Sequence, residues 1–322
     1  MKLVIAGGTG LIGNELAKEL EQEGHRAVVL SRSPERYENE FGDNVTLAAW
    51  DGRNPGGWVA HIEDADAVVN LAGESISGAG FLPDRWDADK KKRILESRIA
   101  AGEVLVRAIE SVDKKPQVLV QASAVGYYGS TGDALITESS PSGDDFLASV
   151  TRDWEASTEA VEALGLRRTI ARIGLVLSTE DGALPRLLLP SRLFAGGWFG
   201  GGDQWWPWIH VADVAGALRF LIEEEAAQGP VNVTAPNPVT NKEFGKALGR
   251  ALNRPSLLPV PAFALRLALG EVSTTVLEGQ RAVPERLLEM GYTFRYPQIN
   301  EALDNLLQEQ KQRRKQNELD LA

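Results

Sequence analysis

Three glycines near the start of the chain have the spacing of a pyrophosphate site. Gly7, Gly10 and Gly13 lie between an apolar run and a helical pattern, in the stretch IAGGTGLIG. Gly7 permits a tight turn, Gly10 lets the backbone approach an anion, and Gly13 allows the helix to pack closely on the strand. The N-terminus of that helix would point free N–H groups at the phosphates. The spacing predicts a dinucleotide site, and the alternative is a glycine-rich turn without a ligand.

The end of the next apolar run indicates which dinucleotide is bound. An acidic residue about 20 residues past the glycines would hold the ribose 2′-hydroxyl of NAD. The sequence has Ser31, Arg32 and Ser33 there instead, and a guanidinium can form paired hydrogen bonds with the 2′-phosphate of NADP. Ser33 could also cap a helix that begins at Pro34, with Arg36 one turn later. NADP(H) is therefore the predicted cofactor, and the alternative is an exposed loop arginine.

Residues after two further strands complete the predicted cofactor site. Asp51 follows the third strand and is expected near the adenine, whereas the segment NLAG (70–73), followed by Glu74, comes after the fourth and is expected beside the nicotinamide ribose. The predicted cofactor-binding residues are Gly7, Thr9, Gly10, Leu11, Ile12, Gly13, Ser31, Arg32, Ser33, Arg36, Asp51, Leu71, Ala72, Gly73 and Glu74.

The elements that position these residues form an alternating pattern. Ile12, Leu16 and Leu20 have helical spacing, and similar patterns separate the apolar runs. Nearly continuous apolar runs are typical of parallel strands that helices cover on both faces. The fold class is therefore α/β, a doubly wound parallel sheet of the Rossmann type. The predicted strands are 2–7, 26–31, 45–50, 67–73, 117–123 and 167–177.

The composition changes after residue 178, which predicts a smaller C-terminal substrate domain. The stretch 192–208 is rich in glycine and tryptophan. Its Trp205, Trp206 and Trp208 could stack on a flat ligand or pack the two domains together. Asp213, after this stretch, is expected to cap a helix. The predicted domains are the Rossmann domain over 1–177 and 209–235, the substrate domain over 178–208 and 236–305, and a polar tail over 306–322.

Composition excludes several classes of function. The 322 residues carry a net charge of −11, which argues against binding to nucleic acid or to an anionic membrane. There is no cysteine, and His25, His61 and His210 lack metal-ligand spacing, so no metal is expected. The apolar stretch 256–270 is too short and interrupted to span a bilayer, and no signal-like segment precedes the first strand. A cytoplasmic protein is expected.

Seven motifs together resemble the atypical, epimerase-family branch of the extended short-chain dehydrogenase/reductase superfamily. This branch is similar to NAD-dependent epimerases and dehydratases, and some members are described as cell-division inhibitors. The resemblance covers residues 1 to about 305. Its motifs are GGTGLIG, NLAGESI, RWDADKKKRILESR, ASAVGYYG, DFLASVTRDWE, GGGDQWWPWIHVADVA and GPVNVTAPNPVTNKEFGKAL.

The resemblance implies an acid/base pair that this chain lacks. Extended members carry Ser or Thr at the end of the fifth strand and then Tyr-x-x-x-Lys on the next helix, in which the lysine lowers the pKa of the tyrosine. Here Ala124, Phe146 and Val150 occupy the serine, tyrosine and lysine positions. Phenylalanine cannot exchange a proton, and valine cannot stabilise a phenolate. The expected machinery is therefore absent.

Four residues are candidates to replace that pair. Tyr127 and Tyr128 follow the fifth strand, Ser123 ends it, and Glu74 lies beside the expected nicotinamide site. Each has a structural alternative: a packed aromatic ring for the tyrosines, a strand end for Ser123, and a ribose contact for Glu74.

Two functions follow. The first is an NADP-dependent oxidoreductase or nucleotide-sugar epimerase-like enzyme acting on a small carbonyl compound. The second is a catalytically silent NADPH-binding regulator or scaffold in bacterial or plastid division, with a protein partner. The sequence fits either a monomer or a homodimer.

Overall fold

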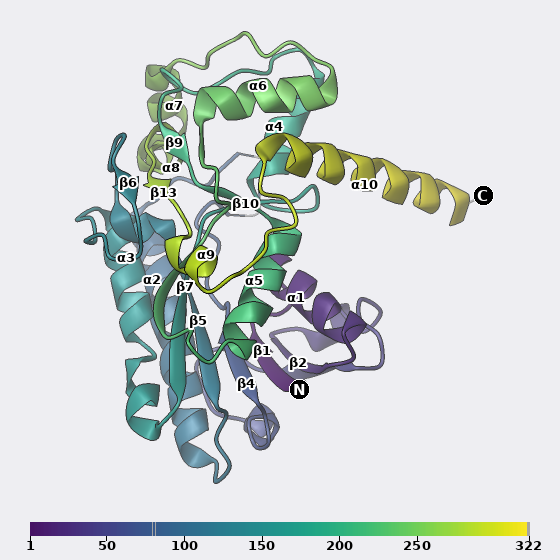
Figure 1. Ribbon diagram of the computed structural model, residues 1–322, viewed down its shortest axis with the longest axis vertical. Coiled ribbons are helices and arrows are strands. Elements are labelled where there is room, and N and C mark those ends of the chain that lie inside the picture. Colours follow the sequence, from purple (N-terminus) through teal and green to yellow (C-terminus); the bar gives the residue numbers. More distant parts are fainter. Residues whose placement is uncertain (79, 81, 321–322) are drawn as a thin grey trace.

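Seven parallel strands form the central sheet of the computed structural model, which describes residues 1–78, 80 and 82–320 (Figure 1). The order across the sheet is β11-β7-β5-β4-β1-β2-β3, so the chain winds outward in both directions from β1. This confirms the predicted Rossmann architecture. The strands are β1 (Lys2–Ala6), β2 (Arg26–Ser31), β3 (Val45–Ala49), β4 (Ala67–Asn70), β5 (Val118–Ala124), β7 (Arg167–Ile173) and β11 (Gly229–Val233).

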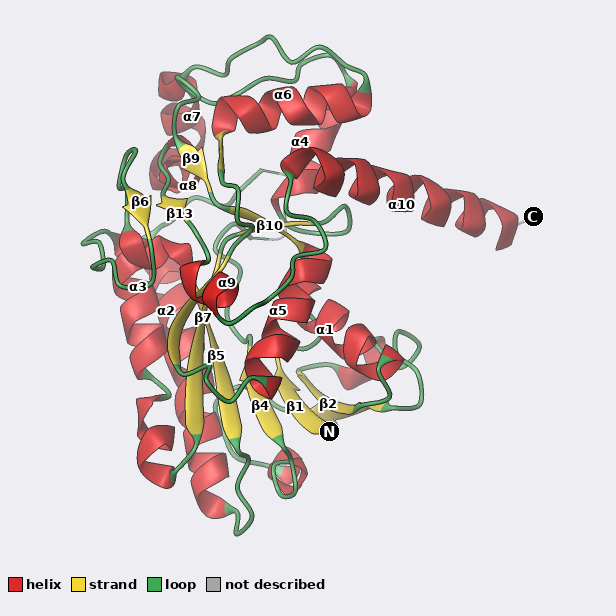
Figure 2. Cartoon of the chain, in the orientation of Figure 1, coloured by secondary structure: helices red, strands yellow, loops and turns green. Residues whose placement is uncertain are grey.

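Helices cover both faces of this sheet because alternate strand residues point to opposite sides. Leu3 and Ile5 of β1 pack in one cluster with α1 (Leu11–Gln22) and α5 (Val211–Glu223). Val4 and Ala6 pack in a second cluster with α2 (Ala88–Ser111). α3 (Phe146–Ala156) lies beside α2 (Figure 2). The inner strands are thus buried on both faces, as their composition predicts, whereas the edge strand β3 is partly exposed.

The sixth predicted strand is wrong in one respect, since it is two strands rather than one. β7 ends at Ile173, and β8 (Leu175–Leu177) leaves the sheet to pair with β10 (Trp208–His210). Gly174 marks the break, because a Cβ there would collide with the carbonyl oxygen of Pro207. The seventh strand, β11, was not predicted. It begins with Gly-Pro and lies at the sheet edge, where proline is tolerated.

A separate apolar cluster, which includes Trp208, Phe244 and Leu303, forms the core of a second lobe. A capping box at Thr240 and Glu243 begins its helix α6. The division into two domains at the predicted boundaries stays a prediction. The elements of this lobe are α4 (Ala183–Arg192), β9 (Trp205–Trp206), β12 (Val239–Thr240), α6 (Asn241–Leu252), α7 (Ala262–Leu269) and α8 (Thr274–Leu277). The chain then returns to the first lobe, where β13 (Arg281–Ala282) pairs with β6 (Leu135–Ile136) and α9 (Glu285–Glu289) packs on β11.

The C-terminal segment is helical through most of the predicted polar tail. α10 (Ile299–Asp320) begins against α6, where Leu303, Leu306 and Leu307 are buried, and its far end projects away from the molecule (Figure 1). The apolar first half of α10 therefore attaches the helix to the second lobe, and its second half is polar. Among the described helices, none combines the length and apolar character needed to cross a membrane.

Candidate functional site

The glycine loop between β1 and α1 is shaped for close approach of an anion. Gly7 has a φ of +75°, and a Cβ there would lie 2.8 Å from the carbonyl carbon of Leu71. A Cβ on Gly13 would collide with the Cα of Gly8. Helix α1 follows the N-cap Gly10, which has no side-chain cap, so the first N–H groups of the helix are available to a ligand. The geometry fits a pyrophosphate.

The end of β2 presents two arginines without partners in the described part of the chain. Arg32 and Arg36 are exposed, and neither side chain makes a hydrogen bond or ion pair with a described residue. The predicted cap at Ser33 is wrong: its side chain makes no capping bond, because Pro34–Arg36 is a single 3-10 turn closed by backbone bonds. The N–H of Ser33 instead donates to Oγ of Ser31 at 3.2 Å.

Asp51 shapes the loop after β3. Its carboxylate accepts from the side-chain amide of Asn54 at 2.7 Å and from the backbone N–H groups of Arg53 and Asn54 at 2.8 Å each. These bonds, the Asn54 side chain first, lower the pKa of Asp51 to about 2. Asp51 is therefore an ionised, exposed residue whose acceptor oxygens already hold its own loop.

The turn after β4 is fixed by a buried amide pair. Asn70 Nδ2 donates to Oε1 of Gln121 at 2.9 Å, and Asn70 Oδ1 accepts from the N–H of Ala72 at 3.2 Å. Beneath this turn lies Arg98, so close to Gly73 that a Cβ there would be 3.0 Å from the guanidinium carbon. The turn therefore has a rigid support.

Arg98 is a site residue that sequence reasoning missed. Its Nη1 donates to the carbonyl oxygens of Glu74 at 3.0 Å and Ile94 at 2.9 Å, and its guanidinium lies 4.8 Å from the ring centre of Trp154. Burial lowers the pKa of Arg98 to about 10. The arginine holds the segment that the sequence places beside the nicotinamide. A charged residue within the apolar pattern of α2 was the available signal.

Glu74 is held in an ion-pair cluster. Its Oε1 lies 3.1 Å from Nζ of the buried Lys90 and 3.5 Å from Nε of Arg93. Burial acts to raise the pKa of Glu74, but the hydrogen bonds and charges of these two cations outweigh it, and the pKa is lowered. Glu74 is thus an ionised hydrogen-bond acceptor near neutral pH rather than a proton donor.

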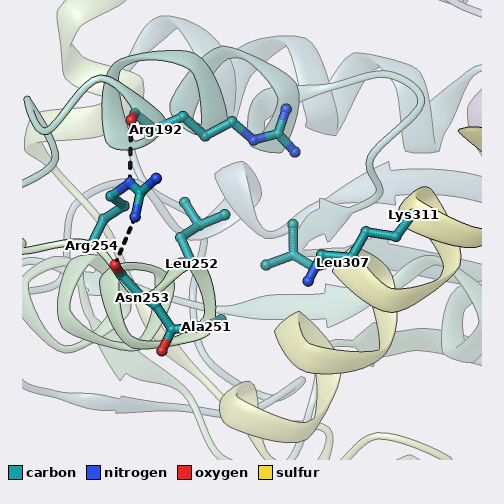
Figure 3. Close-up of a pocket in the computed structure, with 7 residues that line it drawn as sticks. All are labelled: Arg192, Ala251, Leu252, Asn253, Arg254, Leu307 and Lys311. Atoms are coloured by element: carbon teal, nitrogen blue, oxygen red, sulfur yellow. Dashed lines mark hydrogen bonds between the residues drawn. The ribbon is translucent and has the colours of Figure 1, made fainter.

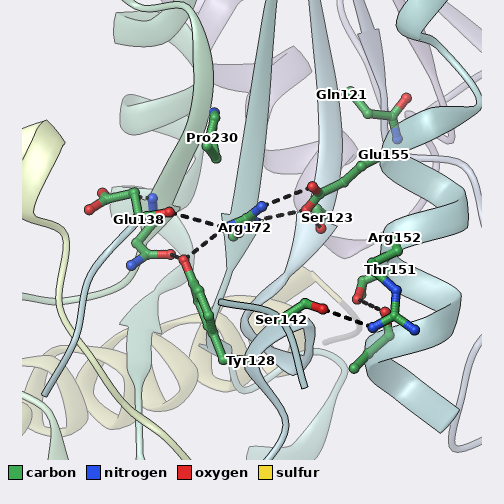
Figure 4. Close-up of polar contacts among 12 residues, drawn as sticks. Gln121, Ser123, Tyr128, Glu138, Ser142, Thr151, Arg152, Glu155, Arg172 and Pro230 are labelled. Carbon is green, nitrogen blue, oxygen red and sulfur yellow. Dashed lines mark hydrogen bonds and ion pairs between the residues drawn. The ribbon is translucent and has the colours of Figure 1, made fainter. Parts of the chain in front are cut away.

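Ser123 belongs to a buried polar network at the end of β5 (Figure 4). Its hydroxyl donates to Oε1 of Glu155 at 2.6 Å. Glu155 also pairs with Arg172, at 2.9 Å to Nε and 3.0 Å to Nη2. The network joins β5, α3 and β7, and it engages the Ser123 hydroxyl inside the protein.

The two neighbouring tyrosines differ in how their hydroxyls are engaged. Tyr128 is buried, donates to Oδ1 of Asn232 at 2.7 Å and accepts from Nη1 of Arg172 at 3.1 Å (Figure 4). Burial raises the pKa of Tyr128. Tyr127 is half-buried, and the guanidinium carbon of Arg172 lies 3.4 Å from its ring centre. The Tyr127 hydroxyl has no hydrogen-bond partner among the described residues.

An apolar cluster fills the positions where the family pair would stand. Phe146 packs edge-on against Trp86, with ring centres 5.3 Å apart. Val150 is buried in the same cluster with Leu269 and Val272 of the second lobe. The missing tyrosine and lysine are therefore replaced by packing between the lobes.

The tryptophans of the glycine- and tryptophan-rich stretch differ in how deeply they are buried. Trp206 and Trp208 are buried in the apolar cluster of the second lobe. Trp205 is half-buried, and its Nε1 donates to Oδ1 of Asp133 at 2.8 Å. Asp213 does not cap α5, because its carboxylate instead accepts the backbone N–H groups of two residues that precede α10, Arg295 and Tyr296. His210 provides the cap.

A hollow of about 310 Å³ lies elsewhere in the second lobe, between α4, α6 and α10 (Figure 3). Three cations, Arg192, Arg254 and Lys311, surround its apolar floor. The residues around it include none of the residues predicted to bind the cofactor or to move a proton.

Comparison with known proteins decides the family. The model of the NAD dependent epimerase/dehydratase family matches residues 3–234. The chain belongs to this family. Residues 260–306 match a second model, a domain of unknown function, DUF1731, so the segment that packs on Val150 is itself a recurring unit.

Relatives extend over nearly the whole chain. The epimerase family protein YfhF of Bacillus subtilis is 41% identical, over 97% of this chain and 99% of that one. A chloroplastic homologue of the epimerase family protein SDR39U1 from Arabidopsis thaliana is 38% identical, over 96% and 87%. The crystal structure of human epimerase family protein SDR39U1 (isoform 2) with NADPH has a TM-score of 0.84 and 34% identity, covering 95% of this chain and 99% of that chain.

Proposed function

We propose that this family member binds NADP(H) across the glycine loop, with Arg32 and Arg36 at the 2′-phosphate. The observation that carries the proposal is a loop in which Gly7 and Gly13 leave no room for a Cβ, followed by two unpaired arginines at the end of β2. A guanidinium at this strand end favours NADP over NAD. The NADPH in the structure of the human relative supports the same choice.

The proposed reaction is that of an oxidoreductase, or of a nucleotide-sugar epimerase-like enzyme, on a small carbonyl or carbinol compound. When bound, the cofactor would carry the hydride, which NADPH would give to a carbonyl carbon and NADP⁺ would take from a carbinol carbon. Tyr127 is the proposed acid/base, because its hydroxyl is unengaged among the described residues and a guanidinium lies against its ring. Ser123 and Tyr128 would then position Arg172, and Glu74 would accept a hydrogen bond from a ribose hydroxyl.

A second candidate function is a catalytically silent NADPH-binding regulator with a protein partner. The apolar cluster at Phe146 and Val150 favours it, because no proton-transfer group stands at either position. Binding of the cofactor is common to both functions. Turnover separates them.

Cofactor binding is tested first, by titrating the protein with NADPH and with NADH. Arg32→Ala is expected to weaken NADPH binding about tenfold or more, because a charge-assisted pair is lost, and to leave NADH binding unchanged. Arg26→Ala is the matched control, since Arg26 is an exposed residue at the opposite end of the same strand. Equal loss for both cofactors, or none, would contradict the 2′-phosphate assignment.

Turnover is tested by following NADPH oxidation with aldehydes, ketones and nucleotide sugars, together with direct assay of sugar epimers. Tyr127→Phe is expected to abolish turnover while NADPH binding is retained. Full activity of this variant would remove Tyr127 from the reaction. Tight NADPH binding by a wild-type protein that turns over none of these compounds supports the regulator.

A further inference from the structure

The hollow between α4, α6 and α10 gathers positive charge on a chain whose net charge is −11 (Figure 3). Arg192, Arg254 and Lys311 line it, and the described residues around it include no carboxylate. Asp304, two turns before Lys311 on α10, pairs with Arg250 at 3.8 Å instead. Like charges that are held together without counter-ions repel one another, so an anion would be stabilised in this hollow.

Arg192, in the last turn of α4, and Lys311, on α10, keep donors free for a ligand. Nη2 of half-buried Arg192 donates to the side-chain oxygen of Gln310, and the guanidinium forms no ion pair with a described residue. Exposed Lys311 makes neither a hydrogen bond nor an ion pair within the described part of the chain. Burial lowers the pKa of Arg192, and the charge of Arg314 acts in the same direction. No described carboxylate therefore neutralises either cation.

Arg254 fixes the rim of the hollow. Its Nε donates to the carbonyl oxygen of Arg192 at 3.4 Å, and its Nη1 donates to that of Asn253 at 3.1 Å. The guanidinium carbon also lies 4.6 Å from the ring centre of Phe194. Arg254 thus joins the end of α4 to the end of α6, as the dashed lines in Figure 3 show. Its charge adds to the hollow, while its N–H groups are largely occupied.

The floor of the hollow is apolar and its size suits a small molecule. Ala251, Leu252 and Leu307 form this floor as part of the apolar cluster of the second lobe. The volume of about 310 Å³ is at the low end of the range of about 300–1,000 Å³ found for ligand pockets. Free cations above an apolar floor suit a compact molecule that has both an anionic group and an apolar part.

We propose that this hollow binds a small phosphate monoester, with the phosphate between Arg192 and Lys311 and the apolar part of the ester on Leu252 and Leu307. The planar fork of arginine matches a phosphate group, and lysine adds a compact charge. A phosphate monoester carries nearly two negative charges at neutral pH, so it balances the gathered cations better than a carboxylate does. None of the predicted cofactor-binding residues lines the hollow, so the site is separate from the proposed function.

The test is calorimetric titration of the full chain with phenyl phosphate, methyl phosphate and benzoate, at neutral pH and constant ionic strength. NADPH is kept saturating so that the glycine loop is occupied. Phenyl phosphate is expected to bind saturably and more tightly than the other two, because it alone combines a dianion with an apolar ring. Lys311→Met and Arg192→Met are each expected to weaken this binding about tenfold or more, whereas Lys311→Arg should retain most of it. Arg266→Met is the matched control, because Arg266 is exposed on α7 and does not line the hollow.

The assignment is overturned if phenyl phosphate does not bind saturably, if methyl phosphate or benzoate binds equally well, if Lys311→Met binds like the wild type, or if Arg266→Met loses as much. Thermal unfolding of each variant checks the fold, and Lys311→Met should leave the Tm unchanged because Lys311 has no polar partner among the described residues. Dependence of binding on Lys311 also distinguishes the hollow from the glycine loop. The test therefore holds even for a protein that fails to bind NADPH.

Discussion

The glycine loop shows, at the scale of the residue, how a single Cβ decides whether a cofactor site can form. Gly13 sits directly on the turn that would hold the pyrophosphate, and a methyl group there meets the backbone of Gly7 and Gly8. Neither neighbour can move without opening the turn. The requirement is one of space at Gly13 and of both space and positive φ at Gly7.

Gly13→Ala is accordingly expected to weaken NADPH binding more than tenfold and to destabilise the fold by roughly 1–3 kcal/mol, as overpacking does. Gly57→Ala is the matched control, because a Cβ at Gly57 meets no atom and its φ is not positive. Nicotinamide fluorescence titration and thermal unfolding measure the two effects. Unchanged NADPH affinity in Gly13→Ala would show that the cofactor does not bind at this turn.

The buried pair of Glu155 and Arg172 is the second place where one residue decides a local structure. Glu155→Ala leaves the Arg172 charge buried without its carboxylate, so we expect a loss of about 3–5 kcal/mol in the free energy of unfolding. Glu96→Ala, which removes an exposed pair with Lys92, is the control and should change little. Denaturant unfolding measures both. A small effect at Glu155 would mean that Tyr128 and solvent compensate the arginine.

Sequence predicts some of these residues and not others for a physical reason. Gly7 and Gly13 could be found because the tight turn that requires glycine is local, so it produces a fixed spacing of glycines in the sequence. Arg98 could not be found, because its importance comes from contacts with Glu74 and Trp154 on other segments. Tyr127 and Tyr128 look alike in the sequence, and burial of the second hydroxyl distinguishes them.

At the scale of the element, the start of α5 carries a histidine whose charge state couples to folding. His210 is buried, accepts the N–H of Ala212 through Nδ1 and contacts Asn305 of α10 through Nε2 at 3.1 Å. Burial lowers the pKa of His210 to about 4 from an ordinary 6.5. The cap therefore works with a neutral ring, and it joins α5 to α10.

The depressed pKa makes the stability contribution of His210 depend on pH. The unfolded chain binds the proton below about pH 6.5, whereas the folded chain does not bind it until about pH 4. The contribution of neutral His210 to the free energy of unfolding is therefore complete at pH 7 and is lost as the pH falls from about 6.5 to about 4. The loss is on the order of 3 kcal/mol. Urea unfolding at several pH values measures it, and His210→Asn, which retains a capping oxygen, should have a shallower dependence. Parallel pH curves would contradict this origin.

The same contrast between local and distant causes holds for the elements. Six strands of the sheet were predicted from their apolar runs, because this pattern is local and needs no knowledge of the partner strand. The break at Gly174 depends on Pro207, which approaches from a segment far along the chain. β11 starts with Gly-Pro and has little strand character of its own, so its place comes from pairing with β7.

At the scale of the whole molecule, the C-terminal segment closes over the positions that carry the acid/base pair in extended relatives. Arg85, which precedes α2, donates to the carbonyl oxygens of Leu267 and Ala268 at the end of α7. Lys91 forms an ion pair of 2.6 Å with Glu271. Next to these contacts in the sequence, Leu269 and Val272 share an apolar cluster with Val150. In this chain, apolar packing between the two lobes thus occupies the positions that would otherwise carry the acid/base pair.

Restoring the family residues should therefore open the junction rather than create an enzyme. Val150→Lys places an ammonium group in a site that is 3% exposed, and we expect a loss on the order of 4 kcal/mol or more in unfolding free energy, because buried lysines lose several pKa units. Phe146→Tyr is the matched variant: Phe146 is half-buried with Lys91 beside its ring, so a hydroxyl can reach water and stability should change little. Thermal unfolding and limited proteolysis of the segment 262–273 measure both effects. A stable Val150→Lys, Phe146→Tyr double variant that reduces carbonyl compounds would contradict this expectation, because it would show that the packing at these positions tolerates the pair and admits a substrate.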